Sequence, residues 1–244
     1  MVDGVLFVLW GSRLIYRLVL IMPALLSART AHSSPLHFAL VTGDVPLCAS
    51  VLARANLTHV VQLIYAKDLA DNATRARFKM PGLLLSPFDR TLYLDVDTHV
   101  CTPALLLEPF ALLRYYDAAM TFAPHQQNEL RCARRAQTGQ ELVYNTGVIY
   151  FNRTALPFIA NWLALSYNHA QRKGCRDQST LHEAIRASPV KVASLSAVYN
   201  FRKNDPFPMW GRVVLVHNPY PLAAQIAECA RLNSVLGERT VGHF

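Results

Sequence analysis

The sequence predicts one α/β domain with a mostly parallel, mixed central sheet that is flanked by helices. Apolar runs of strand length alternate with helical patterns, which is typical of βαβ crossovers and of strands buried on both faces. Of the 244 residues, 52% are apolar, which is enough for a substantial core. The sequence contains no internal repeat, low-complexity tract or convincing linker, so we expect a single domain over residues 1–244.

The apolar stretch Val5–Leu26 fits either a membrane anchor or a strand followed by a helix. Arg13 and Arg17 interrupt it, and each costs about 2.5–3.5 kcal/mol at the centre of a membrane helix. We therefore expect a buried strand at Val5–Trp10, a turn, and a helix from Arg13 in which Pro23 causes a kink or ends the regular part. The expected buried stripe consists of Leu14, Leu18, Ile21 and Leu25. A chain that starts at its first strand is expected to be cytoplasmic, whereas an upstream anchor would place it in the Golgi lumen.

The other elements are expected to alternate in the same way. Asp44 is a predicted helix N-cap, and Pro46 is an early helical proline. Strands are predicted at 36–42, 60–65, 91–94, 118–122, 148–151, 190–195 and 212–216. Helices are predicted at 45–55, 74–85 with a break at Pro81-Gly82, 104–116, 155–171, 178–187 and 222–236. The polar, basic and aperiodic segment 125–141 is predicted to be a mobile loop.

Lys and Arg outnumber Asp and Glu by 24 to 16, and the net charge of +8 favours an anionic partner. Because no recognition-helix, zinc-finger or aromatic RNA-binding signature is present, we do not expect a specific nucleic acid, and no membrane contact is required. The five cysteines form no C-x-x-C pair, which argues against a zinc site or a disulfide framework. We expect most of them to be packed thiols, with a bridge between Cys132 and Cys175 as the alternative.

A pair of aspartates at the end of a predicted strand is the first candidate site. Asp95 and Asp97 are two residues apart on what we expect to be an extended segment, so both carboxylates would point to one side and could bind one hard cation. Ligands of parallel sheets gather at the carboxyl ends of the strands, where this pair is expected. A salt-bridged strand end is the structural alternative.

Four segments form an ordered set that contains this pair. They are Asp89-Arg-Thr-Leu-Tyr-Leu-Asp-Val-Asp-Thr98, Tyr144-Asn-Thr-Gly-Val-Ile-Tyr-Phe-Asn152, Asp177-Gln-Ser-Thr-Leu181 and Val213-Val-Leu-Val-His-Asn218. The set resembles GT-A glycosyltransferases related to family 8, the group that contains glycogenin and LARGE-like enzymes. Asn200-Phe-Arg202 is similar to a motif in uncharacterised nucleotide-diphospho-sugar transferases of this type. The likeness extends from Val5 to about Asn218. It implies a nucleotide-binding half at about 1–100 and a donor-sugar and acceptor half at about 101–244.

The resemblance implies that Asp95 and Asp97 bind a divalent ion that bridges the diphosphate of a nucleotide-sugar, with His217 as the third ligand. The residues agree with this assignment, because His217 ends an apolar predicted strand and so also lies at the edge of the sheet. An imidazole beside two carboxylates suits Mn²⁺ better than Mg²⁺, which remains the second choice. Taken alone, His217 would more often be interpreted as a structural histidine.

The resemblance also implies which residues contact the donor. Asn145, Asp177 and Gln178 correspond to residues that hold the donor sugar and shape its reacting face, and they are our catalytic candidates. Without the family, Asp177 would be interpreted as a helix N-cap. Lys79 lies ten residues before Asp89, as does the donor-binding lysine of the similar proteins.

Lys79 is therefore expected to neutralise a phosphate or contact the sugar, with Arg77 as a second candidate. Solvated charges on a helix are the alternative for both. The remaining donor-binding candidates are Trp10, Gly147, Asn200 and Arg202. Gly147 would let the backbone approach the ligand closely.

The sequence departs from the family after the histidine. Family 8 members usually continue with a glycine and a Lys-Pro-Trp stretch whose lysine binds the diphosphate, whereas here Asn218-Pro-Tyr-Pro221 follows. The diphosphate would then depend on other cations, such as Lys79, Arg202 or Lys203, or the activity would be weak.

The predicted activity is transfer of a sugar from a nucleotide-diphosphate donor, a UDP-sugar first of all, to a hydroxyl of a carbohydrate or protein. The resemblance to family 8 implies retention of the anomeric configuration. A degenerate sugar-nucleotide-binding protein is one alternative, and a metal-dependent nucleotidyltransferase is another. Two-metal versions of the latter need more carboxylates than the second half of the chain offers. Glycoside hydrolysis is disfavoured, because carboxylates two residues apart are poorly placed to flank a bond at about 5–9 Å. The sequence does not define the oligomeric state.

Overall fold

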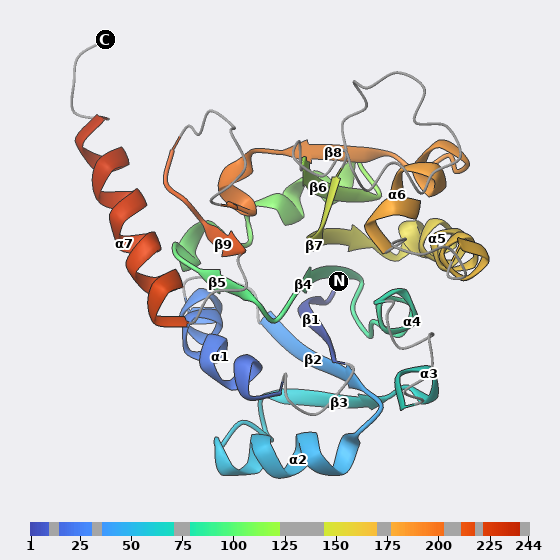
Figure 1. Cartoon of the computed structure of the whole chain (residues 1–244), viewed down its shortest axis with the longest axis horizontal. Coiled ribbons are helices and arrows are strands. Elements are labelled where there is room, and N and C mark those ends of the chain that lie inside the picture. The colour runs from blue at the N-terminus through green and yellow to red at the C-terminus, as the bar shows by residue number, and fades with distance from the viewer. Residues whose placement is uncertain are drawn as a thin grey trace.

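The computed structural model describes residues 1–9, 15–30, 36–70, 79–122, 144–169, 177–202, 211–217 and 222–239, and it shows the expected α/β architecture (Figure 1). The strands are β1 Asp3–Leu9, β2 Leu36–Thr42, β3 Val61–Tyr65, β4 Arg90–Leu94, β5 Thr98–Val100, β6 Ala118–Phe122, β7 Tyr144–Asn152, β8 Val192–Leu195 and β9 Leu215–His217. The α-helices are α1 Ile15–Thr30, α2 Val45–Arg54, α3 Lys67–Ala70, α4 Met80–Leu83, α5 Leu156–His169, α6 Asp177–Arg186 and α7 Leu222–Arg239. Within the described residues, short 3₁₀ helices are η3 Pro103–Leu105, η4 Glu108–Arg114, η6 Arg153–Ala155 and η7 Ala197–Tyr199.

The central sheet has seven strands in the order β3-β2-β1-β4-β7-β6-β8. Strands β1 to β4 pair in parallel, and β6 pairs in parallel with β8. β7 runs antiparallel to both β4 and β6, so it is the one reversed strand of this sheet within the described residues. The prediction of a mostly parallel mixed sheet is confirmed.

Helices cover both faces of the sheet. Because alternate residues of a strand point to opposite faces, each central strand packs against helices on both sides. In β1, Val5 and Phe7 pack into the cluster that includes residues of α1 and α2, whereas Leu6 and Val8 pack into the cluster that includes residues of α4, α5 and α6. This burial on both sides explains why the strands are continuously apolar in sequence.

Helix α1 is a core helix of the fold. Its residues Leu18, Ile21 and Leu25 are buried, as the helical spacing predicts, and Arg17 lies off that stripe. Pro23 lies inside the helix without ending it. Over the part of the chain that the structure describes, no helix combines the length and apolar character needed to cross a bilayer. The turn predicted after Val5–Trp10, the start of the helix at Arg13 and the stripe position Leu14 lie outside the described residues.

Some predicted boundaries are confirmed and others are wrong. Asp44 caps α2, since its Oδ1 accepts a hydrogen bond of 3.2 Å from the backbone N–H of Leu47. The helix predicted at 104–116 is instead the pair of 3₁₀ helices η3 and η4, because Pro109 has no N–H to donate to the middle of an α-helix. Of the helix predicted at 74–85, residues 74–78 lie outside the described residues, and α4 runs through Pro81-Gly82 without the predicted break. Pro81 lies in the first turn of α4, where a missing N–H costs nothing.

A second, two-stranded sheet joins β5 to β9 beside α7 (Figure 1). β9 lies late in the sequence, but it pairs antiparallel with β5, the strand that comes shortly after β4. In this pairing Thr98 is opposite His217. A disulfide between Cys101 and Cys229 ties the end of this sheet to α7. The expectation that most cysteines are packed thiols is therefore wrong for this pair, whose residues are 128 apart in sequence and invisible to short-range spacing. Cys48 is a buried free thiol, and Cys132 and Cys175 lie outside the described residues.

The disulfide generates a prediction about stability. Replacing Cys229 by Ser should lower the free energy of unfolding of the oxidised protein by about 2–4 kcal/mol, because the unfolded chain regains the freedom of a long loop. Urea unfolding with and without reductant measures this: reductant should destabilise the native protein but not the Cys229→Ser variant. Cys48→Ser is the matched control and should remain sensitive to reductant. Equal sensitivity of Cys229→Ser and the native protein would contradict the prediction.

Candidate active site

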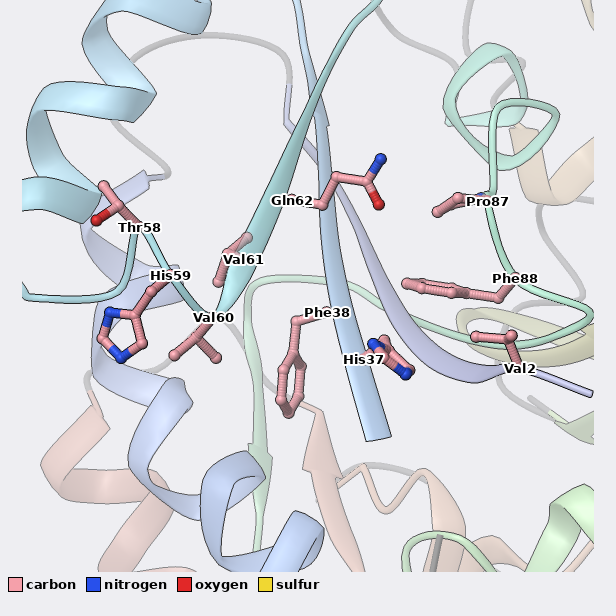
Figure 2. Close-up of a pocket in the computed structure, with 10 residues that line it drawn as sticks. All are labelled: Val2, His37, Phe38, Thr58, His59, Val60, Val61, Gln62, Pro87 and Phe88. Carbon is pink, nitrogen blue, oxygen red and sulfur yellow. The ribbon is translucent and has the colours of Figure 1, made fainter. Parts of the chain in front are cut away.

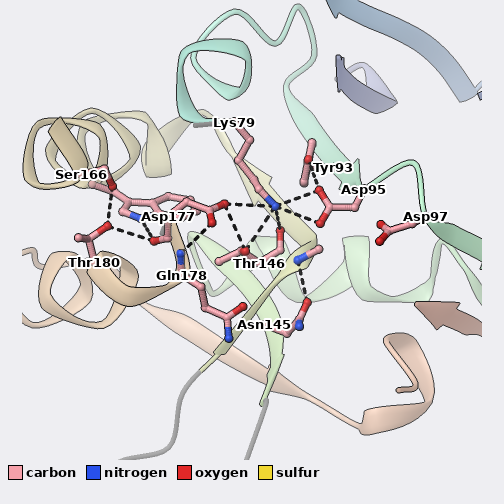
Figure 3. A network of polar contacts seen from close by, with 12 residues as sticks. Lys79, Tyr93, Asp95, Asp97, Asn145, Thr146, Ser166, Asp177, Gln178 and Thr180 are labelled. Carbon is pink, nitrogen blue, oxygen red and sulfur yellow. Dashed lines mark hydrogen bonds and ion pairs between the residues drawn. The ribbon is translucent and has the colours of Figure 1, made fainter. Parts of the chain in front are cut away.

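The candidate site lies at the edge of the sheet where β4 ends. Asp95 follows β4, and the reversed direction of β7 brings the beginning of that strand to the same edge. The backbone N–H of Asp95 accordingly donates to the carbonyl of Gly147 at 2.8 Å. Asp177, the first residue of α6, also faces this edge (Figure 3). Segments from three parts of the sequence therefore meet where ligands of α/β sheets gather.

Two carboxylates and one imidazole converge there. His217 Nε2 lies 3.3 Å from Asp97 Oδ1 and 3.7 Å from Asp95 Oδ2. One ligand atom from each of the three residues lies within 4.8 Å of the others, which is close enough for a single metal ion. The pairing of Thr98 with His217 in the β5–β9 sheet produces this proximity, since β5 begins directly after Asp97.

The backbone geometry of the aspartate pair differs from the expectation. Asp95, Val96 and Asp97 form a turn between β4 and β5 rather than an extended segment. Thr98 Oγ1 and the backbone N–H of Thr98 both donate to the Asp95 carbonyl, at 2.7 and 3.2 Å, and hold that turn. On the other side, Gln225 Nε2 of α7 donates to the carbonyl of Asp97 at 2.9 Å. A tight turn therefore brings the two carboxylates together, rather than the two-residue repeat of side chains along a strand.

A buried ammonium group neutralises the carboxylates (Figure 3). Lys79 is 3% exposed, and its Nζ donates to both oxygens of Asp95 at 2.9 and 3.1 Å. It also donates to the carbonyl of Thr146 at 2.8 Å and lies 3.4 Å from Asp177 Oδ2. The alternative that Lys79 is a solvated helix charge is wrong.

The charges of the site hold one another in the ionised form. Burial alone lowers the pKa of Lys79, but the charges of Asp95 and Asp177 outweigh burial and raise this pKa above its ordinary value. Burial raises the pKa of Asp97, but the hydrogen bond and charge of His217 outweigh it and hold this pKa at about 2. The Asp97 carboxylate is therefore available as an anionic ligand at neutral pH.

Buried amides connect the imidazole to β7. Asn145 Oδ1 accepts from the backbone N–H of Gly147 at 2.7 Å and from Asn200 Nδ2 at 2.8 Å. Asn200 Oδ1 lies 3.0 Å from His217 Nδ1. A Cβ atom at Gly147 would come within 2.0 Å of His217 Cε1, so the glycine makes room for the imidazole. Sequence reasoning expected this close approach to involve the ligand.

The sugar-side candidate Asp177 is held by the helices around it. Its carbonyl accepts from Trp162 Nε1 at 2.7 Å and from Thr180 Oγ1 at 3.1 Å, and its Oδ1 accepts from the N–H of Gln178 at 3.0 Å. Gln178 is buried beside it (Figure 3). Asp177 is thus both the first residue of α6, where its charge suits the helix dipole, and a partner of Lys79.

Sequence reasoning missed three contributors to the site. The Tyr93 hydroxyl donates to Asp95 Oδ1, and the period of two along β4 could have placed it on the same side. Thr146 accepts from Lys79 and stands inside a recognised motif. Gln225 carries no local signal, because only the packing of α7 brings it to Asp97.

Not every candidate joins this cluster. Arg202 is half-buried and follows Phe201, whose backbone bonds to Leu215 and His217 of β9 at 2.8 Å. Several candidates lie outside the described residues. These are Trp10, Arg77, the predicted loop 125–141 and residues 218–221, which follow His217.

A separate pocket of about 330 Å³ lies at the opposite edge of the sheet, where the parallel strands begin (Figure 2). Its lining includes Phe38, Val61 and Phe88 with His37 and His59. Because Asp95, Asp97 and His217 are at the other edge, this pocket is not the candidate active site.

Comparisons with known proteins agree with the architecture. The galactosyltransferase LgtC, in a complex with donor and acceptor sugar analogues, superposes with a TM-score of 0.63 at 15% identity, covering 96% of this chain and 95% of LgtC. The chain has the GT-A fold. Mouse xyloside xylosyltransferase 1 gives a TM-score of 0.63 at 16% identity, covering 90% of this chain and 100% of that one. The glycosyltransferase GlyE of Streptococcus pneumoniae TIGR4 gives 0.57 at 18% identity, covering 99% of this chain and 65% of GlyE. No protein-family model and no curated protein sequence matches the chain.

The space beside Gly147 in this GT-A site can be tested. Gly147→Ala should lower the affinity for Mn²⁺ by about 10–100-fold, because the added methyl group displaces the imidazole of His217. Titration calorimetry measures the affinity. Adding His217→Ala to this variant should restore thermal stability without restoring Mn²⁺ binding, since the clash is then relieved. Full Mn²⁺ affinity in Gly147→Ala would show that the ring is not fixed by this contact.

The buried position of Lys79 leads to a second prediction. Lys79→Met should lower the free energy of unfolding by about 3 kcal/mol, because it leaves Asp95 and Asp177 without their shared cation. Arg153→Met is the matched control, since Arg153 pairs with Asp89 at the surface and should cost less than about 1 kcal/mol. Denaturant unfolding compares the two. Similar losses for both variants would contradict the central role of the buried ammonium.

Proposed function

We propose that the chain is a metal-dependent glycosyltransferase that moves a sugar from a nucleotide-diphosphate donor, a UDP-sugar, to a hydroxyl of a carbohydrate or protein. The observation that carries this proposal is the convergence of Asp95, Asp97 and His217 at the ligand-binding edge of a GT-A fold. The comparison proteins support it, since LgtC is a galactosyltransferase and the mouse protein is a xylosyltransferase.

The three residues form a suitable donor set for a divalent ion. Two carboxylate oxygens and one imidazole nitrogen favour Mn²⁺, with Mg²⁺ as the second choice because it prefers oxygen ligands. Lys79 donates to both oxygens of Asp95 and Tyr93 donates to Oδ1, while Oδ2 also lies 3.7 Å from His217 Nε2. When bound, the ion would supply Lewis-acid stabilisation of the charge that develops on the departing nucleoside diphosphate.

Residues next to this set would hold the donor sugar. We assign this role to Asn145, Asp177 and Gln178, with Gly147 and Asn200 supporting the same wall of the site. Lys79 lies between Asp95 and Asp177, so its charge would fix the metal side of the site relative to the sugar side. We propose retention of the anomeric configuration, which the resemblance to family 8 implies.

The diphosphate needs a further cation on this chain. The Lys-Pro-Trp stretch of family 8 is missing from the sequence, and the ammonium of Lys79 is already shared between two carboxylates. Arg202 follows the segment that pairs with β9 beside His217, and we propose it for the diphosphate. Trp10 and Arg77 remain proposed donor contacts from the sequence alone.

The proposal predicts Mn²⁺-dependent release of UDP from one member of a panel of UDP-sugars, measured by a coupled nucleotide assay. Asp97→Ala should lower turnover on the order of 10²–10³-fold, because one group that stabilises developing charge is lost. Asp44→Ala is the matched control, since it removes a carboxylate that only caps α2 and should leave turnover unchanged. Equal turnover in excess chelator would overturn the proposal, and UDP binding without turnover across the panel would indicate a sugar-nucleotide-binding protein instead.

A further inference from the structure

We propose that Asn200 is a positioning residue that holds His217 in the tautomer with the proton on Nδ1, so that Nε2 presents its lone pair to the two aspartates. A neutral imidazole carries its proton on either nitrogen, and only a nitrogen without a proton can bind a metal. The assignment of the proton itself follows from the hydrogen bonds of the protein. Its consequence for the metal rests on the proposed function.

The backbone provides the starting point. The N–H of Gly147 can only donate, and it donates to the side chain of Asn145 at 2.7 Å. The Asn145 atom at this position must therefore be the oxygen. Because β7 pairs with both β4 and β6, this N–H is part of a rigid sheet, and the orientation of the Asn145 amide is fixed with it.

The orientation of the Asn145 amide then determines the orientation of the Asn200 amide. The same oxygen of Asn145 lies 2.8 Å from the side chain of Asn200, which must contribute its NH₂ group, since two oxygens cannot share a hydrogen bond. The oxygen of Asn200 consequently faces His217 Nδ1 at 3.0 Å. An oxygen that only accepts requires a donor, so Nδ1 carries the proton.

The opposite side of the ring is then without a donor when the imidazole is neutral. Nε2 faces Asp97 Oδ1 at 3.3 Å and Asp95 Oδ2 at 3.7 Å, so three lone pairs converge on one place. Such an arrangement needs a cation there, which is either a second proton on the ring or a metal ion. The two amides thus leave Nε2 of the neutral imidazole as a metal ligand rather than a hydrogen-bond donor.

The surroundings prevent the ring and the amides from rearranging. Asn145, Asn200 and His217 are 2, 4 and 7% exposed, so water does not replace their hydrogen bonds. The backbone N–H of His217 donates to the carbonyl of Phe201 at 2.8 Å, which fixes β9 beside Asn200. Gly147 lies against the imidazole on the side of β7.

Two substitutions at one position separate positioning from packing. Asn200→Ala removes the acceptor for Nδ1, and we expect the affinity for Mn²⁺ to fall by about 10–100-fold. Asn200→Asp retains an acceptor for Nδ1 but places a carboxylate against Asn145 Oδ1, so it should bind Mn²⁺ more tightly than Asn200→Ala although it is less stable to denaturant. If Asn200 had only a structural role, the two variants would rank in the same order for Mn²⁺ affinity and for stability to denaturant. Asn152→Ala, at the far end of β7, is the matched control and should bind Mn²⁺ like the native protein.

The proton itself can be observed without any metal. In metal-free protein with ¹⁵N-labelled histidine, rising pH should remove the ring proton from Nε2 and leave the one on Nδ1, so that the neutral ring of His217 is the tautomer with the proton on Nδ1. His217→Gln identifies the signal. Loss of the Nδ1 proton before the Nε2 proton, or unchanged Mn²⁺ affinity in Asn200→Ala, would overturn the inference. If the native protein bound no Mn²⁺ but showed the Nδ1 proton, the proposed function would fail and the positioning role would stand.

Discussion

The site depends on one buried ammonium group. Lys79 connects Asp95, at the end of β4, to Asp177, at the start of α6, and to the carbonyl of Thr146 on β7. Each of these groups would be costly to bury alone, because a desolvated charge needs a partner. Together they fix the Asp95–Asp97 turn, the reversed strand β7 and the start of α6 in one arrangement. The same lysine therefore maintains the fold and defines the geometry of the proposed chemistry.

The topology of the sheet explains why distant motifs meet. Parallel strands bring their carboxyl ends to one edge, and the reversal of β7 brings the beginning of that strand to the same edge. The β5–β9 pair then places His217 directly beside the aspartate turn. Asn145, Gly147 and Asn200 fill the space behind the imidazole, so the cluster of two carboxylates and one imidazole is supported by the sheet on one side and by α7 on the other.

Local patterns predicted the elements, and the resemblance predicted the ligand set. The stripe of α1, the cap at Asp44 and the fold class are confirmed because spacing and capping act over a few residues. The 3₁₀ helices, the turn at Asp95–Asp97 and the contact of Gln225 depend on proline geometry or on packing between distant segments. Lys79 was a candidate from its position before the aspartates, but its two carboxylate partners follow only from the folded chain. The domain halves and the individual site roles remain predictions.

The covalent link between Cys101 and Cys229 bears on where the protein matures. It joins the strand after Asp97 to the helix whose Gln225 holds the Asp97 carbonyl one turn away. Glutathione keeps cytosolic thiols reduced, whereas such bonds form and persist in secretory compartments. The bond thus favours maturation in the secretory pathway over the cytoplasm. Production in a reducing host would yield a protein whose last helix is no longer covalently held against the turn that carries Asp95 and Asp97.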